Sequence, residues 1–265
     1  MNEQMSEYMD FAKQIAGNAG EIMLKYFKME GISKYKGDRT IVTLADTEIN
    51  SYLIDQVAKK YPTHAVDGEE SKYGSSNHVW VCDPVDGTAQ YARGVPISVF
   101  SLALVIDGVP VVGVVMDPFV NEMYWATKGG GAFVNGERMR VSDIPLEDDR
   151  ALVSFDMVPN AMDFCNVFDV MVDTGKYGVS IGSCVKSCML VAGGHYVAHL
   201  FPCRENKHVD AAAAKVIVEE AGGVVRDFYG NEQRYDQSIT GAIFSNKTNY
   251  TTLLEIVKKH VKEKV

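Results

Sequence analysis

The most informative stretch of this chain is Trp80-Val81-Cys82-Asp83-Pro84-Val85-Asp86-Gly87-Thr88-Ala89-Gln90-Tyr91. It begins as an apolar run, and residues 79 to 82 predict a short buried strand. Pro84 fixes its own φ and favours extended geometry at the residue before it, so we expect a sharp turn after the strand. This turn is predicted to bring two carboxylates together.

Asp83 and Asp86 are the carboxylates of the turn. Two carboxylates this close repel each other unless a cation lies between them, and oxygen-rich clusters favour Mg²⁺ over softer metals. The backbone N–H groups of Gly87 and Thr88 can bind phosphate oxygens, and the Thr88 hydroxyl can position water. The alternative is an ordinary surface turn, because Asp, Pro and Gly all favour turns.

Two other acidic segments bear on that choice. Upstream, Gly68-Glu69-Glu70-Ser71 places paired glutamates after a short apolar stretch. Downstream, Asp210 precedes an alanine-rich run over residues 211–221, which predicts a helix ending at Gly222-Gly223. On the simpler interpretation, Asp210 is only the N-cap of that helix.

Length and charge narrow the class of protein. With 265 residues, 46% of them hydrophobic, the chain can bury a large core in one compact unit or in two closely packed halves. Its formal net charge of −9 provides no basic surface for nucleic acid, and no apolar run is long enough to span a membrane. The first ten residues do not resemble a secretion signal, so we expect a cytoplasmic protein without nucleic-acid or membrane partners.

The five cysteines include no CxxC pair, which suits a reducing compartment. Cys184 and Cys188 are expected to share one face of a helix. For this pair, the sequence favours small buried residues over zinc ligands. Four histidines lack a convincing metal-ligand spacing and are interpreted as structural or surface residues: His64, His195, His199 and His208.

The hydrophobic pattern of the first half predicts two helices followed by antiparallel strands. Apolar residues at helical spacing predict helices over residues 3–29 and 43–60, separated by a polar loop. Strands are predicted over residues 99–106, 111–116 and 122–126, with Asp107-Gly108 as a hairpin turn. An antiparallel run framed by helices favours α+β layers over a doubly wound sheet.

The second half has a mixed pattern that starts after an acidic stretch at residues 147–149. The predicted helices cover residues 160–174, 184–193 and 210–221. The predicted strands cover residues 151–154, 178–181, 196–200, 224–226 and 242–245. We therefore divide the chain into an N-terminal α+β half, residues 1–146, and a C-terminal α/β half, residues 147–265.

Several ordered motifs together resemble the signatures of the inositol monophosphatase family. They are Val42-Thr43-Leu44-Ala45-Asp46, Gly68-Glu69-Glu70-Ser71, Asp83-Pro84-Val85-Asp86-Gly87-Thr88, the glycine-rich segment 128–136, Gly182-Ser183, Asp210-Ala211-Ala212 and Glu220-Ala221-Gly222-Gly223. The resemblance covers most of residues 36–223. It implies a layered αβαβα sandwich of the sugar phosphatase type, with an active site between two halves.

The resemblance also implies a set of metal ligands. Glu69, Asp83 and the Val85 carbonyl are expected to hold one Mg²⁺, while Asp83, Asp86 and Asp210 hold a second. Glu70 is an accessory residue that can support these ligands or hold a third ion. The implied cofactor is thus two or three Mg²⁺ ions, with Mn²⁺ as a possible substitute, and the implied enzyme is sensitive to Li⁺.

Three residues are implied to activate the attacking water. Its proton is expected to move towards Thr88 and Asp46, or towards Glu69. Lys36 lies in the polar loop where the family often carries a lysine that approaches the site, although an exposed loop lysine is nearly as good an interpretation. For Asp46 alone, the simpler reading is a solvated acidic residue in the first turn of a helix, favoured by the helix dipole.

The substrate is less well determined than the chemistry. Gly87, Thr88, Gly182 and Ser183 are the expected substrate contacts. At position 203, where inositol phosphatases commonly carry a sugar-binding Glu, this chain has a cysteine, and Arg204 or Glu205 can substitute for that Glu. We therefore include Cys203 and Arg204 as candidate substrate contacts. Ala89-Gln90-Tyr91 and Val209 also depart from the usual family residues.

The resulting hypothesis is a Mg²⁺-dependent phosphomonoesterase that acts on a small phosphorylated polyol or sugar. The family resemblance alone implies a homodimer. Histidinol phosphate, fructose 1,6-bisphosphate, adenosine 3′,5′-bisphosphate and NADP are the alternative substrates. The alternative from a different class is a protein without catalytic activity that binds Mg²⁺ or a phosphorylated metabolite.

Overall fold

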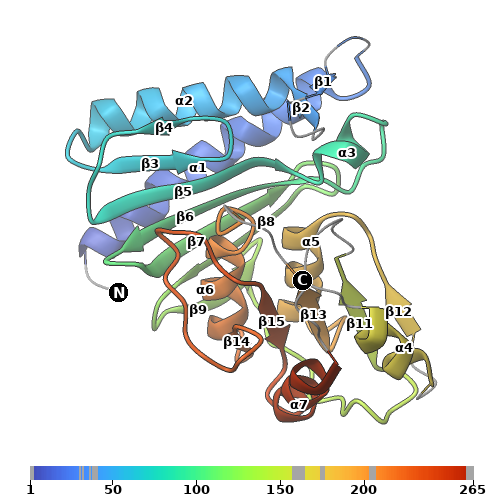
Figure 1. The fold of residues 1–265 in the computed structure, drawn as a ribbon. Helices are drawn as coiled ribbons and strands as arrows, with labels where there is room; N and C mark the ends of the chain where they lie inside the picture. The colour runs from blue at the N-terminus through green and yellow to red at the C-terminus, as the bar shows by residue number, and fades with distance from the viewer. Residues whose placement is uncertain are drawn as a thin grey trace.

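The computed structural model describes residues 3–29, 31, 33–35, 37, 41–156, 165–173, 177–202 and 207–260. Within these residues, helices and sheets alternate in five layers (Figure 1). Two long helices cover the outer face of an eight-stranded sheet, and two shorter helices separate that sheet from a five-stranded sheet. The last two helices pack on the far side of the smaller sheet. The predicted α+β fold, a layered αβαβα sandwich, is confirmed.

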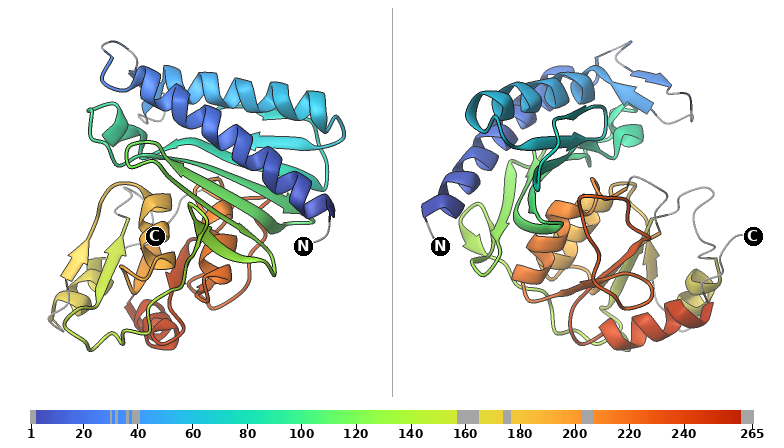
Figure 2. Two further views of the ribbon diagram at one scale, coloured as in Figure 1. Left: turned by 180° about the vertical axis from the view of Figure 1, so that it is seen from behind. Right: turned by 60° about the vertical axis from the view of Figure 1, so that its left-hand side comes forward.

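The outer helices are α1 (Glu3–Tyr26) and α2 (Leu44–Lys60), which cross the large sheet side by side (Figure 2). Helix α1 buries one face because its apolar residues recur every three or four positions, as at Tyr8, Ala12 and Ile15. Thr43 begins α2 with a capping box, in which its side chain and the Asp46 carboxylate each bind the other residue's backbone N–H. Both predicted helices are confirmed.

The large sheet has the strand order β10-β9-β8-β7-β6-β5-β3-β4, and only the β3–β5 pair is parallel. A separate hairpin, β1 (Ser33–Tyr35) and β2 (Ile41–Thr43), lies beside the start of α2, and the one-turn helix α3 (Thr88–Tyr91) follows β5. The strands of the large sheet are β3 (Ala65–Gly68), β4 (Lys72–Tyr73), β5 (His78–Asp86), β6 (Val99–Ile106), β7 (Val109–Asp117), β8 (Glu122–Thr127), β9 (Gly131–Val134) and β10 (Glu137–Arg138).

The smaller sheet has the order β12-β11-β13-β15-β14. Its strands are β11 (Leu152–Phe155), β12 (Tyr177–Val179), β13 (Ala198–Phe201), β14 (Val224–Arg226) and β15 (Ala242–Ser245). Helices α5 (Cys184–Ala192) and α6 (Ala212–Glu220) form the middle layer, and α4 (Cys165–Asp173) and α7 (Tyr250–His260) form the last one. Three hydrophobic cores fill the space beneath α1 and α2, around the middle layer, and beneath α4 and α7.

Two local predictions were wrong. The strand predicted to end at Cys82 continues to Asp86, because β5 keeps pairing with β6 through Ser101 and Val99 across an irregularity in register. The turn therefore lies at Gly87. Asp210 is not the N-cap of α6, because the helix begins at Ala212 and its cap residue is Ala211.

The predicted polar loop of residues 31–39 contains strand β1, and the sequence did not predict α7. None of the described helices combines the length and the hydropathy needed to cross a membrane.

Candidate active site

The end of β5 places two acidic side chains inside the protein. Asp83 and Asp86 are 2% and 5% exposed, and the Asp83 carboxylate accepts a hydrogen bond from the Val85 N–H at 3.0 Å. The Thr88 hydroxyl donates to the Val85 carbonyl at 2.8 Å and so closes the turn. Gly87 has φ +83°, and a Cβ there would lie 3.0 Å from the Gly182 carbonyl oxygen. Only glycine combines this backbone angle with this close approach.

The start of α5 fixes the Asp86 carboxylate. The Ser183 hydroxyl donates to one oxygen of Asp86, and the Val185 N–H donates to the same oxygen at 2.9 Å. The Cys184 N–H reaches the other oxygen at 3.3 Å. Negative charge is favoured at a helix N-terminus, so α5 orients this carboxylate and partly compensates its charge.

Asp210 completes a first group of three carboxylates with Asp83 and Asp86. One oxygen from each lies within 4.8 Å of the others, and all three residues are buried. Burial, reinforced by Asp210, raises the pKa of Asp86 to about 8. Burial also raises the pKa of Asp83 well above its usual range, and Asp83 and Asp210 share a carboxyl–carboxyl hydrogen bond. Without a cation, such a pair must share a proton.

A second carboxylate group lies at the end of β3. Because Gly68 pairs with Cys82 in the parallel β3–β5 register, Glu69 comes to lie beside Asp83, and the two interact electrostatically. Oxygens of Asp46, Glu69 and Glu70 lie within 4.8 Å of one another.

Within this group, Asp46 is held from α2. Its Oδ2 accepts the Thr43 N–H at 2.8 Å and the Thr43 hydroxyl at 2.5 Å. Its Oδ1 is buried without a hydrogen-bond partner, and burial raises the pKa of the carboxyl to about 7. The simpler reading, a solvated acid in the first turn of a helix, is wrong because Asp46 is fully buried.

Lys207 links the two groups and was missed by the sequence analysis. Its Nζ lies 3.0 Å from an Asp210 oxygen and 3.7 Å from a Glu69 oxygen. Asp210 raises the pKa of Lys207 well above its usual value, so the ammonium stays charged at neutral pH. The signal available in the sequence was a lysine three residues before Asp210, although that spacing occurs often by chance.

Asp156 is a further acidic residue that was missed. It directly follows β11, and it interacts electrostatically with both Asp86 and Asp210. Burial, with the nearby Asp210, raises its pKa to about 7. The only signal in the sequence was an acidic residue at the end of a predicted strand.

The remaining predicted substrate residues have mixed outcomes. Gly182 lies against the Gly87 turn and Ser183 lies against Asp86. The Ser183 hydroxyl is hydrogen-bonded to Asp86 and also caps α5 by accepting the Lys186 N–H at 3.2 Å. Lys36, Cys203 and Arg204 lie outside the described residues.

These donors suit a hard divalent cation. All of them are oxygens, which Mg²⁺ prefers, and the buried carboxylates interact repulsively with one another. The partnerless Oδ1 of Asp46 and the carboxyl–carboxyl hydrogen bond both show acceptor capacity that the chain itself leaves unfilled.

Replacing Lys207 with methionine is expected to tighten Mg²⁺ binding by about tenfold, a change of about 1.4 kcal/mol. The ammonium provides the positive charge that a metal ion would provide, so it competes with the ion for Glu69 and Asp210. Calorimetric titration with Mg²⁺ measures the change. Lys72→Met is the matched control because Lys72 pairs with Asp67 at 2.9 Å but is exposed. Unchanged or weaker Mg²⁺ binding in Lys207→Met would show that the lysine does not compete.

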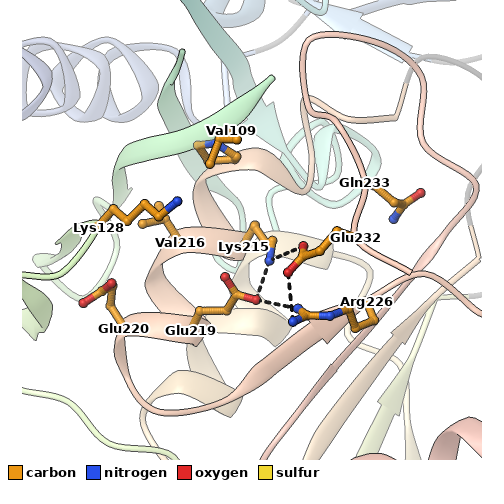
Figure 3. Close-up of a pocket in the computed structure, with 10 residues that line it drawn as sticks. Val109, Lys128, Lys215, Val216, Glu219, Glu220, Arg226, Glu232 and Gln233 are labelled. Atoms are coloured by element: carbon orange, nitrogen blue, oxygen red, sulfur yellow. Dashed lines mark hydrogen bonds and ion pairs between the residues drawn. The ribbon is translucent and has the colours of Figure 1, made fainter. Parts of the chain in front are cut away.

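A separate pocket of about 430 Å³ lies beside α6 and β14 (Figure 3). Its lining includes none of the carboxylates described above. Lys215 and Arg226 each form ion pairs with both Glu219 and Glu232 in this pocket, as the dashed lines show. These pairs largely neutralise its charge, and the candidate active site remains the carboxylate cluster.

Comparison with known proteins identifies the family of the chain. The model of the inositol monophosphatase family matches residues 4–262. A fructose-1,6-bisphosphatase/inositol-1-monophosphatase of Thermotoga maritima is 31% identical over 258 residues, which are 96% of this chain and 97% of that protein. A histidinol-phosphatase of Chlorobaculum parvum is 32% identical over 238 residues, which are 88% of this chain and 90% of that protein.

Solved structures agree with the sequence comparison. An IMPase/NADP phosphatase, solved in complex with Mg²⁺ and phosphate, superposes with a TM-score of 0.85 at 25% identity. The match covers 99% of this chain and 100% of that one. The family match spans nearly the whole chain and includes every described carboxylate of the site. The chain therefore belongs to the inositol monophosphatase family and is a phosphomonoesterase.

Proposed function

We propose that the chain is a Mg²⁺-dependent phosphatase that hydrolyses a small phosphorylated polyol or sugar. The observation that carries this proposal is the meeting of two carboxylate groups beside the Gly87 turn. The first group is fully buried, and the second has a buried Asp46 and two partly exposed glutamates: Asp83, Asp86, Asp210 and Asp46, Glu69, Glu70. A binding protein needs no proton acceptor next to its ligand cluster, whereas a water that attacks a phosphate ester must give up a proton.

The residues that would hold Mg²⁺ are Glu69, Asp83, the Val85 carbonyl, Asp86 and Asp210. When bound, Mg²⁺ supplies positive charge that neutralises phosphate oxygens and favours ionisation of an attacking water. Two or three ions are proposed, with Glu70 as the accessory residue and Mn²⁺ as a substitute.

The chain itself supplies positioning and a proton acceptor. Thr88 fixes the turn through the Val85 carbonyl, and its backbone N–H and that of Gly87 are proposed to bind phosphate oxygens. The Oδ1 of Asp46 is proposed to accept the water proton, because it is buried without a hydrogen-bond partner while Thr43 holds the other oxygen. Glu69 is the alternative acceptor.

The substrate proposal rests on the names of the relatives and on the positions at which this chain differs from the usual family residues. Relatives of similar identity are named for fructose-1,6-bisphosphatase and inositol-1-monophosphatase activity, for histidinol-phosphatase activity and, among structures, for NADP phosphatase activity. These names include three of the alternative substrates, histidinol phosphate, fructose 1,6-bisphosphate and NADP. The fourth alternative, adenosine 3′,5′-bisphosphate, remains from the family resemblance alone. Homodimer formation, Li⁺ sensitivity, cytoplasmic location and the division at residues 146 and 147 stay predictions.

A panel of phosphate esters tests the function. Phosphate release from inositol 1-phosphate and the four alternative substrates is measured with Mg²⁺, with Mn²⁺ and with EDTA. Asp86→Asn is expected to lower kcat/KM at least a hundredfold, because the variant loses a charged ligand from the site. Asp227→Asn is the matched control, since Asp227 is also buried but holds a loop by accepting the Tyr229 and Asn231 N–H groups. Failure of all five esters with either metal would favour the non-catalytic binding protein.

A further inference from the structure

A second cluster of metal-ligating side chains lies in the middle of the molecule. One donor atom each from Cys184, Cys188 and His199 lies within 4.8 Å of the others, and all three residues are buried. Cys184 and Cys188 are one turn apart on α5, so their side chains share a helix face. His199 lies on β13, a central strand of the smaller sheet, against which α5 packs.

The His199 imidazole has one ring nitrogen with a partner and one without. Its Nδ1 lies 2.9 Å from the Ser154 hydroxyl, whereas its Nε2 is buried with no hydrogen-bond partner. The residue is 0% exposed. A buried imidazole nitrogen without a partner is costly. Histidines that bind metals commonly use the other nitrogen to hold a hydrogen-bond partner, as His199 Nδ1 does with Ser154.

We propose that Cys184, Cys188 and His199 form a binding site for a soft divalent cation of the zinc type, separate from the carboxylate site. Two thiolates and one imidazole are a common donor set for Zn²⁺, with a fourth position left for another ligand. Zinc–sulfur bonds of about 2.3 Å in a tetrahedral arrangement require donor atoms roughly 3.8 Å apart, so the trio needs only a small contraction.

The charge of this site also suits its location. Binding one M²⁺ releases one proton from each of the two thiols, which leaves M²⁺, two thiolates and a neutral imidazole with a net charge of zero. A neutral centre avoids most of the cost of burying an uncompensated ion. Mg²⁺ does not share this preference, because it selects oxygen donors. The two sites are therefore expected to take different metals.

The cation would join α5 to β13 directly behind the phosphatase site. Cys184 is the first residue of α5, and its own N–H donates to Asp86. Its thiol also lies 3.8 Å from the Asp210 carbonyl oxygen. A metal on Cys184 would thus hold the helix N-terminus that orients Asp86. The expected role is structural, and it is detectable without any substrate.

Metal content and X-ray absorption of the intact wild-type chain test the site. Because the trio is buried, the cation must enter as the chain folds, so the protein is produced in cells supplied with Zn²⁺. It is then gel-filtered in excess Mg²⁺, which occupies the carboxylates. We expect about one Zn²⁺ per chain, with two sulfur neighbours in the X-ray absorption spectrum. Absence of Zn²⁺, or a shell of oxygen and nitrogen alone, would overturn the proposal without any need for a variant.

Variants then assign the ligands. The double variant Cys184→Ala, Cys188→Ala is expected to lower the Zn²⁺ content at least tenfold, and His199→Gln is expected to lower it as well. The matched control is Cys82→Ala, which removes another buried free cysteine that lies outside the trio and should keep the metal. Loss of Zn²⁺ in the control, or its retention in the double variant, would contradict the assignment.

Discussion

Asp83→Asn is expected to abolish Mg²⁺-dependent phosphate release and, at the same time, to raise the thermal unfolding midpoint of the metal-free protein. Burial, followed by the nearby charges of Glu69, Asp210 and Asp86, raises the pKa of Asp83 well above its usual range. At neutral pH the native state therefore holds a proton on this carboxyl group that the unfolded chain gives up, which costs stability. Asparagine is neutral in both the native and the unfolded state, so the variant avoids this cost.

The amide also fits the hydrogen bonds of the site. Its oxygen can still accept the Val85 N–H, which lies 3.0 Å from Asp83 Oδ1, and its NH₂ group can donate to Asp210 in place of the shared proton. The substitution also removes the negative charge of the residue that is proposed to bridge two metal ions. One substitution should thus stabilise the empty protein and remove its response to Mg²⁺.

Thermal unfolding with EDTA and with Mg²⁺ measures both effects. For a chain of this size, a gain of 1 kcal/mol corresponds to roughly 2 to 4 °C. Asp227→Asn serves as the control because its carboxylate accepts backbone N–H groups at 2.7 and 2.9 Å, so the same substitution should give no gain. A lower midpoint for Asp83→Asn in EDTA, or a Mg²⁺ shift equal to that of the wild type, would refute the interpretation.

Much of the fold could be predicted because the apolar runs and turn residues in the sequence match the strands and turns that form. Strand β6 and the turn at Asp107-Gly108 follow from an unbroken apolar run and a turn pair in which both residues adopt positive φ. Strands β14 and β15 likewise have their predicted bounds. The hairpin β1–β2 was missed because β1 is three exposed polar or aromatic residues with no alternation to detect.

The continuation of β5 was missed for a tertiary reason. Pro84 lacks a backbone N–H, so local rules end the strand before it. In the structure, β6 pairs with both Asp83 and Asp86 and tolerates the irregularity between them. The acidic residues are therefore positioned by a sheet rather than by a free turn.

The carboxylates could be predicted from the order of their motifs, but Lys207 and Asp156 could not. Lys207 contacts Asp210, three residues along the chain, but it reaches Glu69 only across the fold. Asp156 interacts with Asp86 and Asp210, which are both far from it in the sequence. Single lysines and aspartates in loops are common, and their chemistry depends on neighbours far away in the sequence. The grouping of Cys184, Cys188 and His199 could not be predicted for the same reason, since β13 and α5 meet only in the folded chain.

The stability of the metal-free protein is expected to fall as the pH rises from 6.5 to 8.5. Burial raises the folded-state pKa of Asp46 and Asp156 to about 7 and that of Asp86 to about 8, from a usual value of 3.8. In this range the native state holds protons that the unfolded chain has already released, so unfolding becomes easier as the pH rises. The slope reaches about 1.4 kcal/mol per pH unit for each proton held.

The pH range begins at 6.5 because, below that pH, His199 makes stability increase as the pH rises. Burial lowers its pKa from 6.5 to about 3, so its contribution to stability increases with pH only up to about 6.5. Above that pH only the carboxyl groups remain to be titrated among these four residues. The proposed Mg²⁺ would bind the carboxylates in their ionised form, so its stabilising effect should grow over the same range in which the metal-free protein weakens.

Unfolding midpoints at pH 6.5, 7.5 and 8.5, with EDTA and with Mg²⁺, give the result directly. The two curves are expected to diverge as the pH rises, and Asp83→Asn should flatten the EDTA curve because one source of repulsion has been removed. An EDTA curve that is level or rises over this range would mean that the carboxyl groups are ionised in the empty protein. In that case the Lys207 ammonium, rather than bound protons, would balance the negative charge of the carboxylates. Lys207→Met would then be expected to lose more stability than Asp83→Asn over this pH range.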